Sequence, residues 1–338
     1  MNPQKYKLTP KDYPDRHISR GRIKTENTHS QSNWVSFQLS EAIKNNNTDG
    51  ITRIIFGGVS PNYPLQDSIG RKETPLIVAL RAEKPESFET LLKVGADPNV
   101  DGFLNKPPLW YAAKSGNLAC INKLLKYKVQ VTPTNGSRNP INLLTRFINN
   151  GIEEVWYLDG PAMFPSVMEF GLKPRTEKLT IITELIAAGV PLNQKDENKK
   201  TPLYWSLKNN DFDLFMLLTS SGANIPQKRE MKLSELPTEW RNQRKLDWLN
   251  SVRNKPRSLS DLTRITIRNT ILKINRTDIR PSIDKLPLPR ILKSYLKFWP
   301  EIDLALRTEP RIARDSFQPP PIHFFGPPGY KINNMFLD

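Results

Sequence analysis

Side chains that commonly carry out catalysis or bind metals are scarce in this chain. It contains one cysteine, Cys120, and three histidines, His17, His29 and His323, with the histidines near the two ends of the sequence. A nucleophile beside a histidine base, or a zinc site of cysteine and histidine ligands, needs several such groups close together. Gly57-Gly58 also lacks the lysine and helix that complete a phosphate-binding loop. The sequence therefore predicts a protein that is not an enzyme and has no metal site and no cofactor.

An apolar motif near residue 260 has the spacing of a helix with one apolar face. Residues 256–268 read PRSLSDLTRITIR, in which Ser258 can accept a hydrogen bond from the first turn of a helix. The positions after it have the i, i+3, i+4, i+7 spacing of one helical face. This face consists of Leu259, Leu262, Thr263 and Thr266. We expect an amphipathic helix here.

A second motif follows about twenty residues later and reads LPLPRILKSYL, residues 286–296. Its two prolines favour an extended approach, and Pro289 can occupy the first position of a second helix. The apolar face expected for this helix consists of Ile291, Leu292, Tyr295 and Leu296. The two motifs together predict a helical hairpin.

The chain before these motifs contains an internal repeat, which has to position the hairpin. TPLIVA begins at Thr74, PPLWYAA follows 33 residues later, TPLYWS begins at Thr201, and Asn139 opens a weaker copy. A second apolar element lies 17 residues into each clear copy. Threonine suits a helix N-cap, proline the first helical position, and a glycine such as Gly95 the end of the second helix. Each unit is therefore expected to be a pair of short helices.

The phrases TPLIVAL and LLKVGADPN resemble the ankyrin repeat, and the resemblance covers residues 34–225 as about five units. It implies an all-α ankyrin-repeat solenoid that binds other proteins, because such helix pairs bury their apolar faces only by stacking. The fourth unit carries an insertion at about 149–176, which is rich in large apolar side chains. We expect the insertion to pack back onto the array. A ligand-binding arm is the alternative.

In the ankyrin frame, hairpin tips and the ends of first helices present the variable residues. The positions that this resemblance places there, and that we take as candidates for binding a target protein, are Arg71, Glu73, Arg81, Phe103, Leu104, Lys106, Lys114, Ser115, Arg138, Arg146, Glu197, Asn198, Lys200, Lys208 and Asn209. Phe103 and Leu104 stand out because exposed apolar side chains often anchor a partner. Trp110, Tyr111, Tyr204 and Trp205 fall inside helices and are expected in the core.

Residues 256–299 resemble a SOCS box, and the whole chain resembles the ankyrin-repeat and SOCS-box proteins, which are substrate receptors of ubiquitin ligases. The resemblance implies that the first helix carries a BC box for elongin C. The matching residues are Leu259, Leu262, Thr263, Ile267 and Arg268. It also implies a cullin box that selects cullin-5 with its RING partner. The matching residues are Leu286, Pro287, Leu288 and Pro289.

Thr263 departs from the BC box, which usually has a cysteine there. Burying an unbonded hydroxyl costs about 1–3 kcal/mol. A hydrogen bond from Thr263 back to the carbonyl of Leu259, four residues earlier, would satisfy the hydroxyl. We therefore expect elongin binding to be weakened rather than abolished.

The net charge of +16 is concentrated in residues 226–299, which hold 18 basic and 7 acidic residues. Because this block coincides with the hairpin, we interpret it as steering toward an acidic protein partner. Nucleic-acid binding is the disfavoured alternative, since it would require basic side chains interleaved with aromatic ones on one face. The sequence shows no signal peptide and no apolar run long enough to span a membrane, which predicts an intracellular protein of the cytoplasm, the nucleus or both.

The expected order of segments is a flexible basic N-terminus (1–33), the ankyrin array (34–225), a linker with one helix (226–255), the SOCS box (256–299) and a proline-rich tail (300–338). Two functions fit this order. In the first, the repeats hold a target while the hairpin recruits elongin B/C and cullin-5. In the second, the protein is an ankyrin scaffold or inhibitor whose hairpin only caps the stack.

Overall fold

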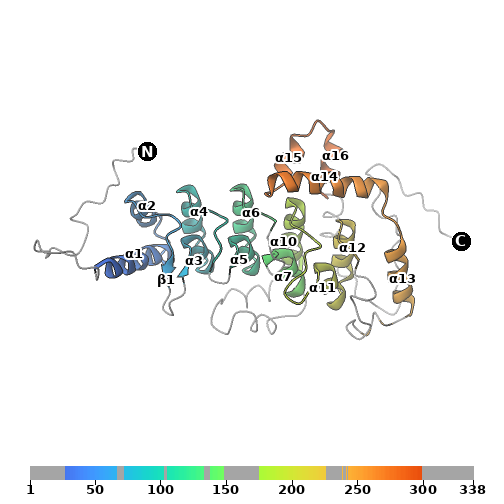
Figure 1. The fold of residues 1–338 in the computed structure, drawn as a ribbon, viewed down its shortest axis with the longest axis horizontal. Coiled ribbons are helices and arrows are strands. Elements are labelled where there is room, and N and C mark those ends of the chain that lie inside the picture. The colour runs from blue at the N-terminus through green and yellow to red at the C-terminus, as the bar shows by residue number, and fades with distance from the viewer. Residues whose placement is uncertain are drawn as a thin grey trace, which may run out of the picture. The chain divides into compact units, whose positions relative to one another are not determined.

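The structure is a computed structural model that describes residues 27–66, 72–102, 105–132, 138–147, 175–225, 238, 241 and 243–298. The predictions for most of the N-terminus, for nearly all of the insertion and for the proline-rich tail fall outside these residues. The chain forms two compact units, Met1–Val129 and Gln130–Asp338. Regular structure in the described part is helical apart from two strands of two residues each (Figure 1). The all-α prediction is confirmed.

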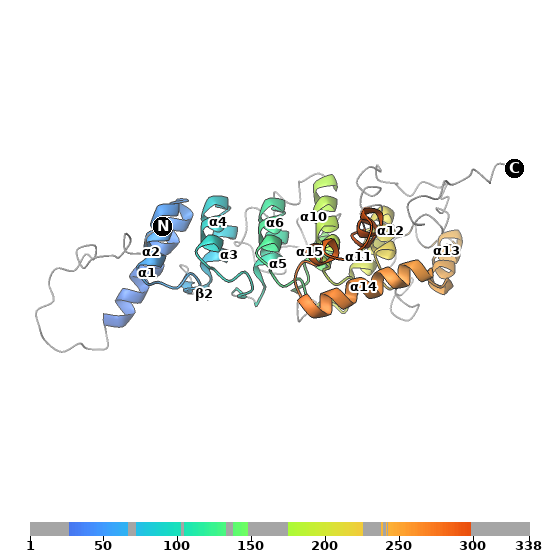
Figure 2. The same cartoon turned by 90° about the horizontal axis from the view of Figure 1, so that it is seen from above.

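The first unit consists of successive helix pairs and one short hairpin of strands. Its successive helices are in contact, α1 with α2, α3 with α4 and α5 with α6, and Figure 2 shows the last two pairs next to each other. Strands β1 and β2 pair antiparallel, with Leu65 opposite Glu73. The elements are α1 (Asn27–Lys44), α2 (Thr48–Phe56), β1 (Leu65–Gln66), β2 (Lys72–Glu73), α3 (Pro75–Arg81), α4 (Pro85–Lys93), α5 (Pro108–Lys114) and α6 (Leu118–Lys126).

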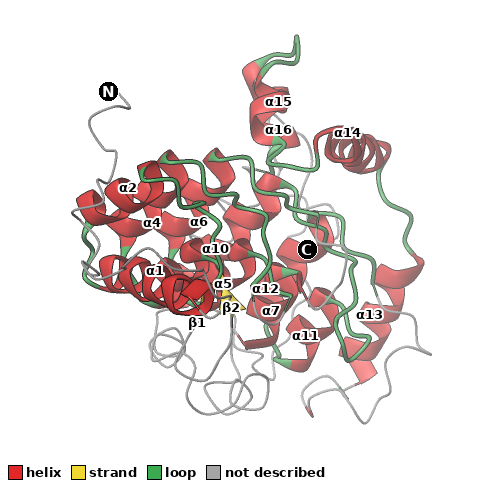
Figure 3. Cartoon of the chain, turned by 60° about the vertical axis from the view of Figure 1, so that its left-hand side comes forward, coloured by secondary structure: helices red, strands yellow, loops and turns green. Residues whose placement is uncertain are grey.

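The second unit begins with two further pairs and ends in the predicted hairpin. Helix α7 packs against both α10, which follows the insertion, and α11, and α11 packs against α12. A longer helix, α14, is followed by two short ones that stand beside it in Figure 3. The elements are α7 (Pro140–Phe147), α10 (Arg175–Ala188), α11 (Pro202–Lys208), α12 (Phe212–Ser220), α13 (Gln243–Asn254), α14 (Leu259–Asn275), α15 (Arg280–Asp284) and α16 (Arg290–Leu296).

The caps of the repeat helices form as the sequence predicts. Thr74 Oγ1 accepts from the N–H of Ile77 at 3.4 Å, and a proline occupies the first helical position of α3. Thr201 caps α11 in the same way. In the weaker copy Asn139 takes the place of threonine, since its Oδ1 accepts from the N–H of Ile141 at 2.9 Å. Local hydrogen bonds therefore set where these helices begin, and stacking stabilises them.

Aromatic side chains of the repeat phrases lie in the core, as expected. Trp110, Tyr111, Tyr204 and Trp205 are all buried, and each neighbouring pair meets edge to face. Cys120 is buried too, and desolvation raises the pKa of its thiol to about 11. The thiolate is therefore scarcely populated at neutral pH, which makes this cysteine a packing group rather than a nucleophile.

The C-terminal hairpin differs from the expected two helices in two respects. The connection contains a third helix, α15, whose Ile283 is buried in a small core with Ile279 and Leu296. Pro289 is the N-cap of α16 rather than its first helical residue, because its ψ of 152° is extended. Among the described helices, none has the length and apolar character that crossing a membrane requires.

Candidate functional site

The outer face of α14 carries the apolar stripe that the sequence predicts. Ser258 caps this helix, with Oγ accepting from the N–H of Asp261 at 3.1 Å. Leu259 is 81% exposed and Leu262 is 47% exposed. Thr263 is exposed one turn after Leu259 on the same side of the helix. Large aliphatic side chains this open to solvent are unusual in a helix that packs well on its other face, so the stripe is a candidate docking site.

The threonines of this stripe have no unsatisfied hydroxyl. Thr263 Oγ1 donates to the carbonyl of Leu259 at 2.8 Å, as expected from the sequence. Thr266 donates to Leu262 at 2.8 Å, and Thr270 donates to Thr266 at 2.9 Å. When a partner covers these residues, each hydroxyl keeps its hydrogen bond to a backbone carbonyl. The free-energy cost of burying an unbonded hydroxyl, expected above for Thr263, therefore does not arise.

One residue assigned to the BC box does not belong to the stripe. Arg268 is 6% exposed on the opposite side of α14, and its assignment as a direct elongin contact is therefore corrected. The physical reason is helical periodicity, because residue 268 lies nine positions after Leu259 and is turned to the far side of the helix. Ile267 is half-buried at the edge of the stripe, where it packs against the small core of the hairpin, and its assignment stays a prediction.

The buried face of α14 is built on two arginines one turn apart. The guanidinium of Arg264 lies over the rings of Tyr295 and Phe298, at 4.2 and 4.3 Å from their centroids. Arg268 lies 4.3 Å from the Phe298 centroid, and its Nη1 donates to the carbonyl of Leu296 at 2.6 Å. These stacked contacts hold α14 to the end of α16, because planar guanidinium groups pack well on aromatic faces.

The same arginines, with Arg257, bind the carboxyl ends of repeat helices. Arg268 Nη2 donates to the carbonyl of Ile186 near the end of α10. Arg264 Nη2 donates to the carbonyl of Ser220 at 3.0 Å, and Arg257 donates to those of Thr219 and Ala223 at 3.1 and 2.7 Å. The last carbonyls of a helix lack partners within it and carry partial negative charge. The hairpin therefore adds charged donors to the carbonyls at the ends of α10 and α12 and in the turn after α12.

Additional contacts join the loop before α15 to α10. The N–H of Ile279 donates to the carbonyl of Ala188 at 3.1 Å. Arg280 pairs with Asp278 at 2.8 Å and also with Glu184. Arg280 is half-buried, and its pKa is raised although burial alone would lower it, because both carboxylates favour the charged form. This ion-paired arginine fixes the hairpin at a second point.

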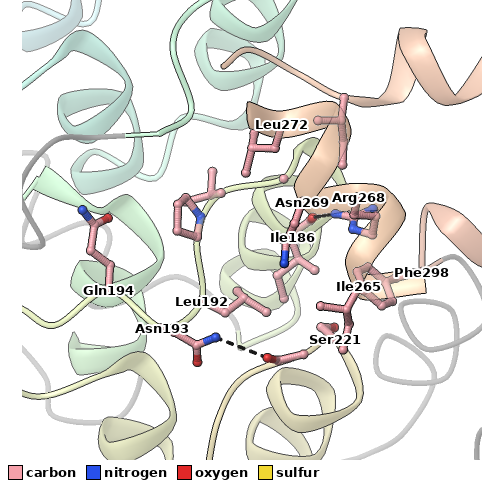
Figure 4. Close-up of a pocket in the computed structure, with 15 residues that line it drawn as sticks. Ile186, Leu192, Asn193, Gln194, Ser221, Ile265, Arg268, Asn269, Leu272 and Phe298 are labelled. Atoms are coloured by element: carbon pink, nitrogen blue, oxygen red, sulfur yellow. Dashed lines mark hydrogen bonds between the residues drawn. The ribbon is translucent and has the colours of Figure 1, made fainter. Parts of the chain in front are cut away.

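A cavity of about 160 Å³ lies where α14 meets the loops after α10 and α12 (Figure 4). Its lining is partly apolar and partly polar. The apolar part includes Ile186, Leu192, Ile265 and Phe298, and the polar part includes Asn193 and Ser221. Asn193 and Gly222 both line the cavity, and Asn193 Nδ2 donates to the carbonyl of Gly222 at 3.4 Å. The cavity belongs to the junction of hairpin and repeats.

Two C-cap glycines of the repeats are also contact points for the hairpin. Gly189 and Gly222 have φ of +101° and +110°, and a Cβ on either would lie 3.1–3.2 Å from an isoleucine, Ile279 or Ile265. Gly58 has a similar φ of +107°, but a Cβ there would meet nothing within 4 Å. A side chain at either position would adopt a strained φ and would push the isoleucine of the hairpin by a few tenths of an ångström.

Gly222→Ala is expected to destabilise the second unit by about 1 kcal/mol more than Gly58→Ala destabilises the first, because the new methyl group must displace Ile265 and with it α14. Hydrogen exchange provides the specific readout. The amides of α14 should exchange faster in Gly222→Ala and at the wild-type rate in Gly58→Ala. Equal protection of α14 in the two variants would contradict the close contact.

The cullin-box motif forms the turn before α16. Leu286 and Leu288 are half-buried against the small core of the hairpin, whereas Pro287 and Pro289 are exposed. The apolar face expected for α16 is split. Tyr295 and Leu296 are buried, and Ile291 and Leu292 remain exposed. The exposed members form a second apolar surface on the hairpin.

The candidate target-binding residues are not all available to a partner. Glu73 is buried in an ion pair with Arg81, and Lys114 is 4% exposed with its Nζ 5.1 Å above the ring of Trp110. Ser115 is buried, with Oγ donating to the carbonyl of Ala112. For these three positions the expectation of an exposed side chain was wrong, because each packs against its own repeat.

The other candidates differ in exposure. Glu197, Asn198 and Lys208 are exposed, and the half-buried ones are Arg81, Lys106, Arg138, Lys200 and Asn209. Arg71, Phe103, Leu104 and the side chain of Arg146 lie outside the described residues. The tip that holds Glu197 and Asn198 is well braced, because Asp196 accepts from the N–H groups of Asn198 and Lys200 and from Trp205 Nε1.

The structural role of the basic block was missed by sequence reasoning. Four of its arginines make the contacts between hairpin and repeats described above: Arg257, Arg264, Arg268 and Arg280. Part of the positive charge that we interpreted as steering a partner therefore stabilises the junction of hairpin and repeats. One signal was present. Arg264 and Arg268 stand four residues apart, on the side of the predicted helix opposite Leu259.

Comparisons with known proteins agree with this architecture. The family model described as SOCS box matches residues 255–297, and the one described as Ankyrin repeats (3 copies) matches residues 39–135. Inversin of Homo sapiens is 26% identical over 203 residues, which are 60% of this chain and 16% of inversin. An ankyrin repeat protein of Fowlpox virus (strain NVSL) is 29% identical over 116 residues, 34% of this chain and 39% of its own length.

The chain thus spans about a sixth of the length of the inversins it matches, and what it shares with them is confined to part of each protein. Ankyrin repeats and SOCS boxes are interaction domains rather than catalytic ones. The matched segments and the helix pairs and hairpin of the structure agree with each other. The chain combines ankyrin repeats with a C-terminal SOCS box, the domain combination of the ankyrin-repeat and SOCS-box family.

Proposed function

We propose that this protein is the substrate-recognition adaptor of an intracellular cullin–RING ubiquitin ligase. Its SOCS box binds elongin B/C and cullin-5 with its RING partner, and its ankyrin repeats hold the target protein. The observation that carries the proposal is the exposed stripe of α14, where Leu259 is open to solvent at the start of a helix that is firmly held on its other side.

The adaptor contributes proximity, not chemistry. Transfer of ubiquitin belongs to the RING partner and its conjugating enzyme, and the adaptor raises the effective concentration of the target beside them. A hairpin fixed to the carbonyl ends of α10 and α12 suits this role, because the last repeats and the ligase then keep one orientation. No catalytic residue is assigned to this chain.

The alternative of a capping hairpin has specific support, since Arg257, Arg264 and Arg268 do cap repeat helices. Capping alone, however, needs only the buried face of α14. It gives no reason for a leucine that is 81% exposed at residue 259 or for a proline-rich turn that exposes Pro287 and Pro289. We therefore propose that the hairpin caps the array and also recruits the ligase.

The target surface is proposed on the braced tip of the fifth unit. Glu197 and Asn198 are exposed there, and Lys200 lies beside them with its Nζ 4.1 Å from the centroid of the Tyr204 ring. Because Asp196 holds the backbone of this tip, the tip loses little conformational entropy when a target binds. Its charged and polar side chains can therefore contact the target at a low entropic cost. The tip presents charges of both signs, so a target with mixed charge fits it.

The double substitution of Leu286 and Pro287 by alanine tests the cullin assignment. It is expected to lower the affinity for cullin-5 about tenfold or more, because it removes the kink and the apolar side chain ahead of α16. Binding of elongin B/C should be unchanged within a factor of about 2–3, since neither substituted residue lies on the exposed stripe of α14. The measurement is biolayer interferometry of purified chain, first with elongin B/C and then with cullin-5. Unchanged cullin-5 affinity in the double variant would show that the cullin box has been misassigned.

A further inference from the structure

The exposed stripe of α14 does not end where the BC-box resemblance ends. The helix continues to Asn275, and the stripe continues with it through Thr270 to Ile274. Ile274 is 76% exposed, which among the exposed large apolar side chains of the described residues is second only to Leu259. An apolar side chain so open to solvent, at the far end of the helix from another one, calls for an explanation.

Helical geometry places Ile274 on the same side of α14 as Leu259. The two residues are fifteen positions apart, which corresponds to about 22 Å along the axis and a net turn of about 60°. Thr263, Thr266 and Thr270 fill the surface between them. The stripe is thus a row of four helical turns with an aliphatic side chain at each end.

Packing within the hairpin does not use Ile274. Its neighbours Ile271 and Leu272 are the ones that turn toward the small core of Ile279, Ile283 and Leu296. The helix stops two residues later at Arg276, whose φ of +56° and N–H bond to the carbonyl of Leu272 end it locally. A polar residue at position 274 would serve the fold equally well.

We propose that Ile274 is a second anchor for elongin C, at the opposite end of the face that begins with Leu259. The inference rests on the proposed function and extends it. The three threonines between the anchors can be buried at low cost, because each hydroxyl already donates to a backbone carbonyl four residues earlier.

The test is a titration of elongin B/C against the full chain and two variants, Ile274→Ala and Ile274→Lys, by isothermal titration calorimetry. Lysine is chosen because a cation suits the last turn of a helix, so this variant keeps α14 folded. We expect the alanine variant to bind about 5–10-fold more weakly and the lysine variant about 30-fold more weakly, as for a buried aliphatic contact.

The matched control is Ile291→Lys, because Ile291 is 59% exposed on α16 of the same hairpin and lies off the stripe. Its affinity for elongin B/C should equal that of the wild type. Wild-type affinity in both Ile274 variants, with binding still abolished by Leu259→Asp, would overturn the second anchor and leave the proposed function standing. Failure of the wild-type chain to bind elongin B/C would overturn both.

Discussion

Arg268→Ala is expected to lower the free energy of unfolding of the second unit by about 3–5 kcal/mol. The guanidinium is buried and donates to the carbonyls of Leu296 and Ile186, and it also lies against the ring of Phe298. Hydrogen bonds from a charged donor contribute about 1.5–3 kcal/mol each. Their loss removes a donor from the carbonyl of Leu296 and leaves that of Ile186 with the N–H of Gly189. One substitution thereby weakens the core of the hairpin and its attachment to α10.

The measurement is urea unfolding followed by hydrogen exchange, because a repeat array can lose its end before the rest. The N–H of Ile279, which donates to Ala188, should lose protection in Arg268→Ala. Arg268→Lys keeps the charge but loses the planar guanidinium group. Its free energy of unfolding should lie between those of the wild type and Arg268→Ala. Arg290→Ala removes an exposed arginine of the same hairpin and should stay within about 0.5 kcal/mol of wild type. A comparably small effect of Arg268→Ala would contradict the proposed attachment.

Leu259→Asp is expected to abolish binding of elongin B/C, with a loss of affinity of at least about 100-fold. The substitution places a charge where the proposed complex buries the most exposed leucine of the stripe, and an unpaired buried charge is strongly disfavoured. The fold should be unaffected. Leu259 is the first residue of α14, and an acidic side chain in the first turn of a helix is favourable.

The matched control is Phe37→Asp, which makes the same kind of change at an apolar side chain that is 60% exposed on α1. Calorimetric titration should give it wild-type affinity for elongin B/C. Thr263→Val and Thr263→Cys should also bind at least as well as the wild type, since the internal hydrogen bond of Thr263 leaves no hydroxyl for the partner to satisfy. If Leu259→Asp retained the wild-type affinity, α14 would not be the elongin-binding helix.

Local patterns made the repeat helices and the exposed stripe predictable. Thr74 and Thr201 cap their helices because the signal and its hydrogen-bond partner lie within three residues of each other. The stripe from Leu259 to Thr266 follows from helical spacing alone. The bond from Thr263 to Leu259 was predictable for the same reason.

The junction was not predictable, because its partners are far apart in the chain. Arg264 binds a carbonyl 44 residues away, and Arg268 binds one 82 residues away. Charge counting assigns such arginines to the solvent, and only the packed structure shows them buried. The exposure expected for Glu73 and Lys114 was wrong for a related reason. Alignment to the repeat predicts where a residue lies in the unit, but it does not predict which neighbouring side chain buries that residue.

The central claim is that one face of α14 is held by the repeats while the opposite face recruits the ligase. Size-exclusion chromatography with light scattering, on the purified full chain mixed with elongin B/C and cullin-5, tests it most directly. The account predicts that all components elute as one complex, and that Leu259→Asp elutes separately from elongin B/C and cullin-5. A wild-type chain that elutes alone would contradict it.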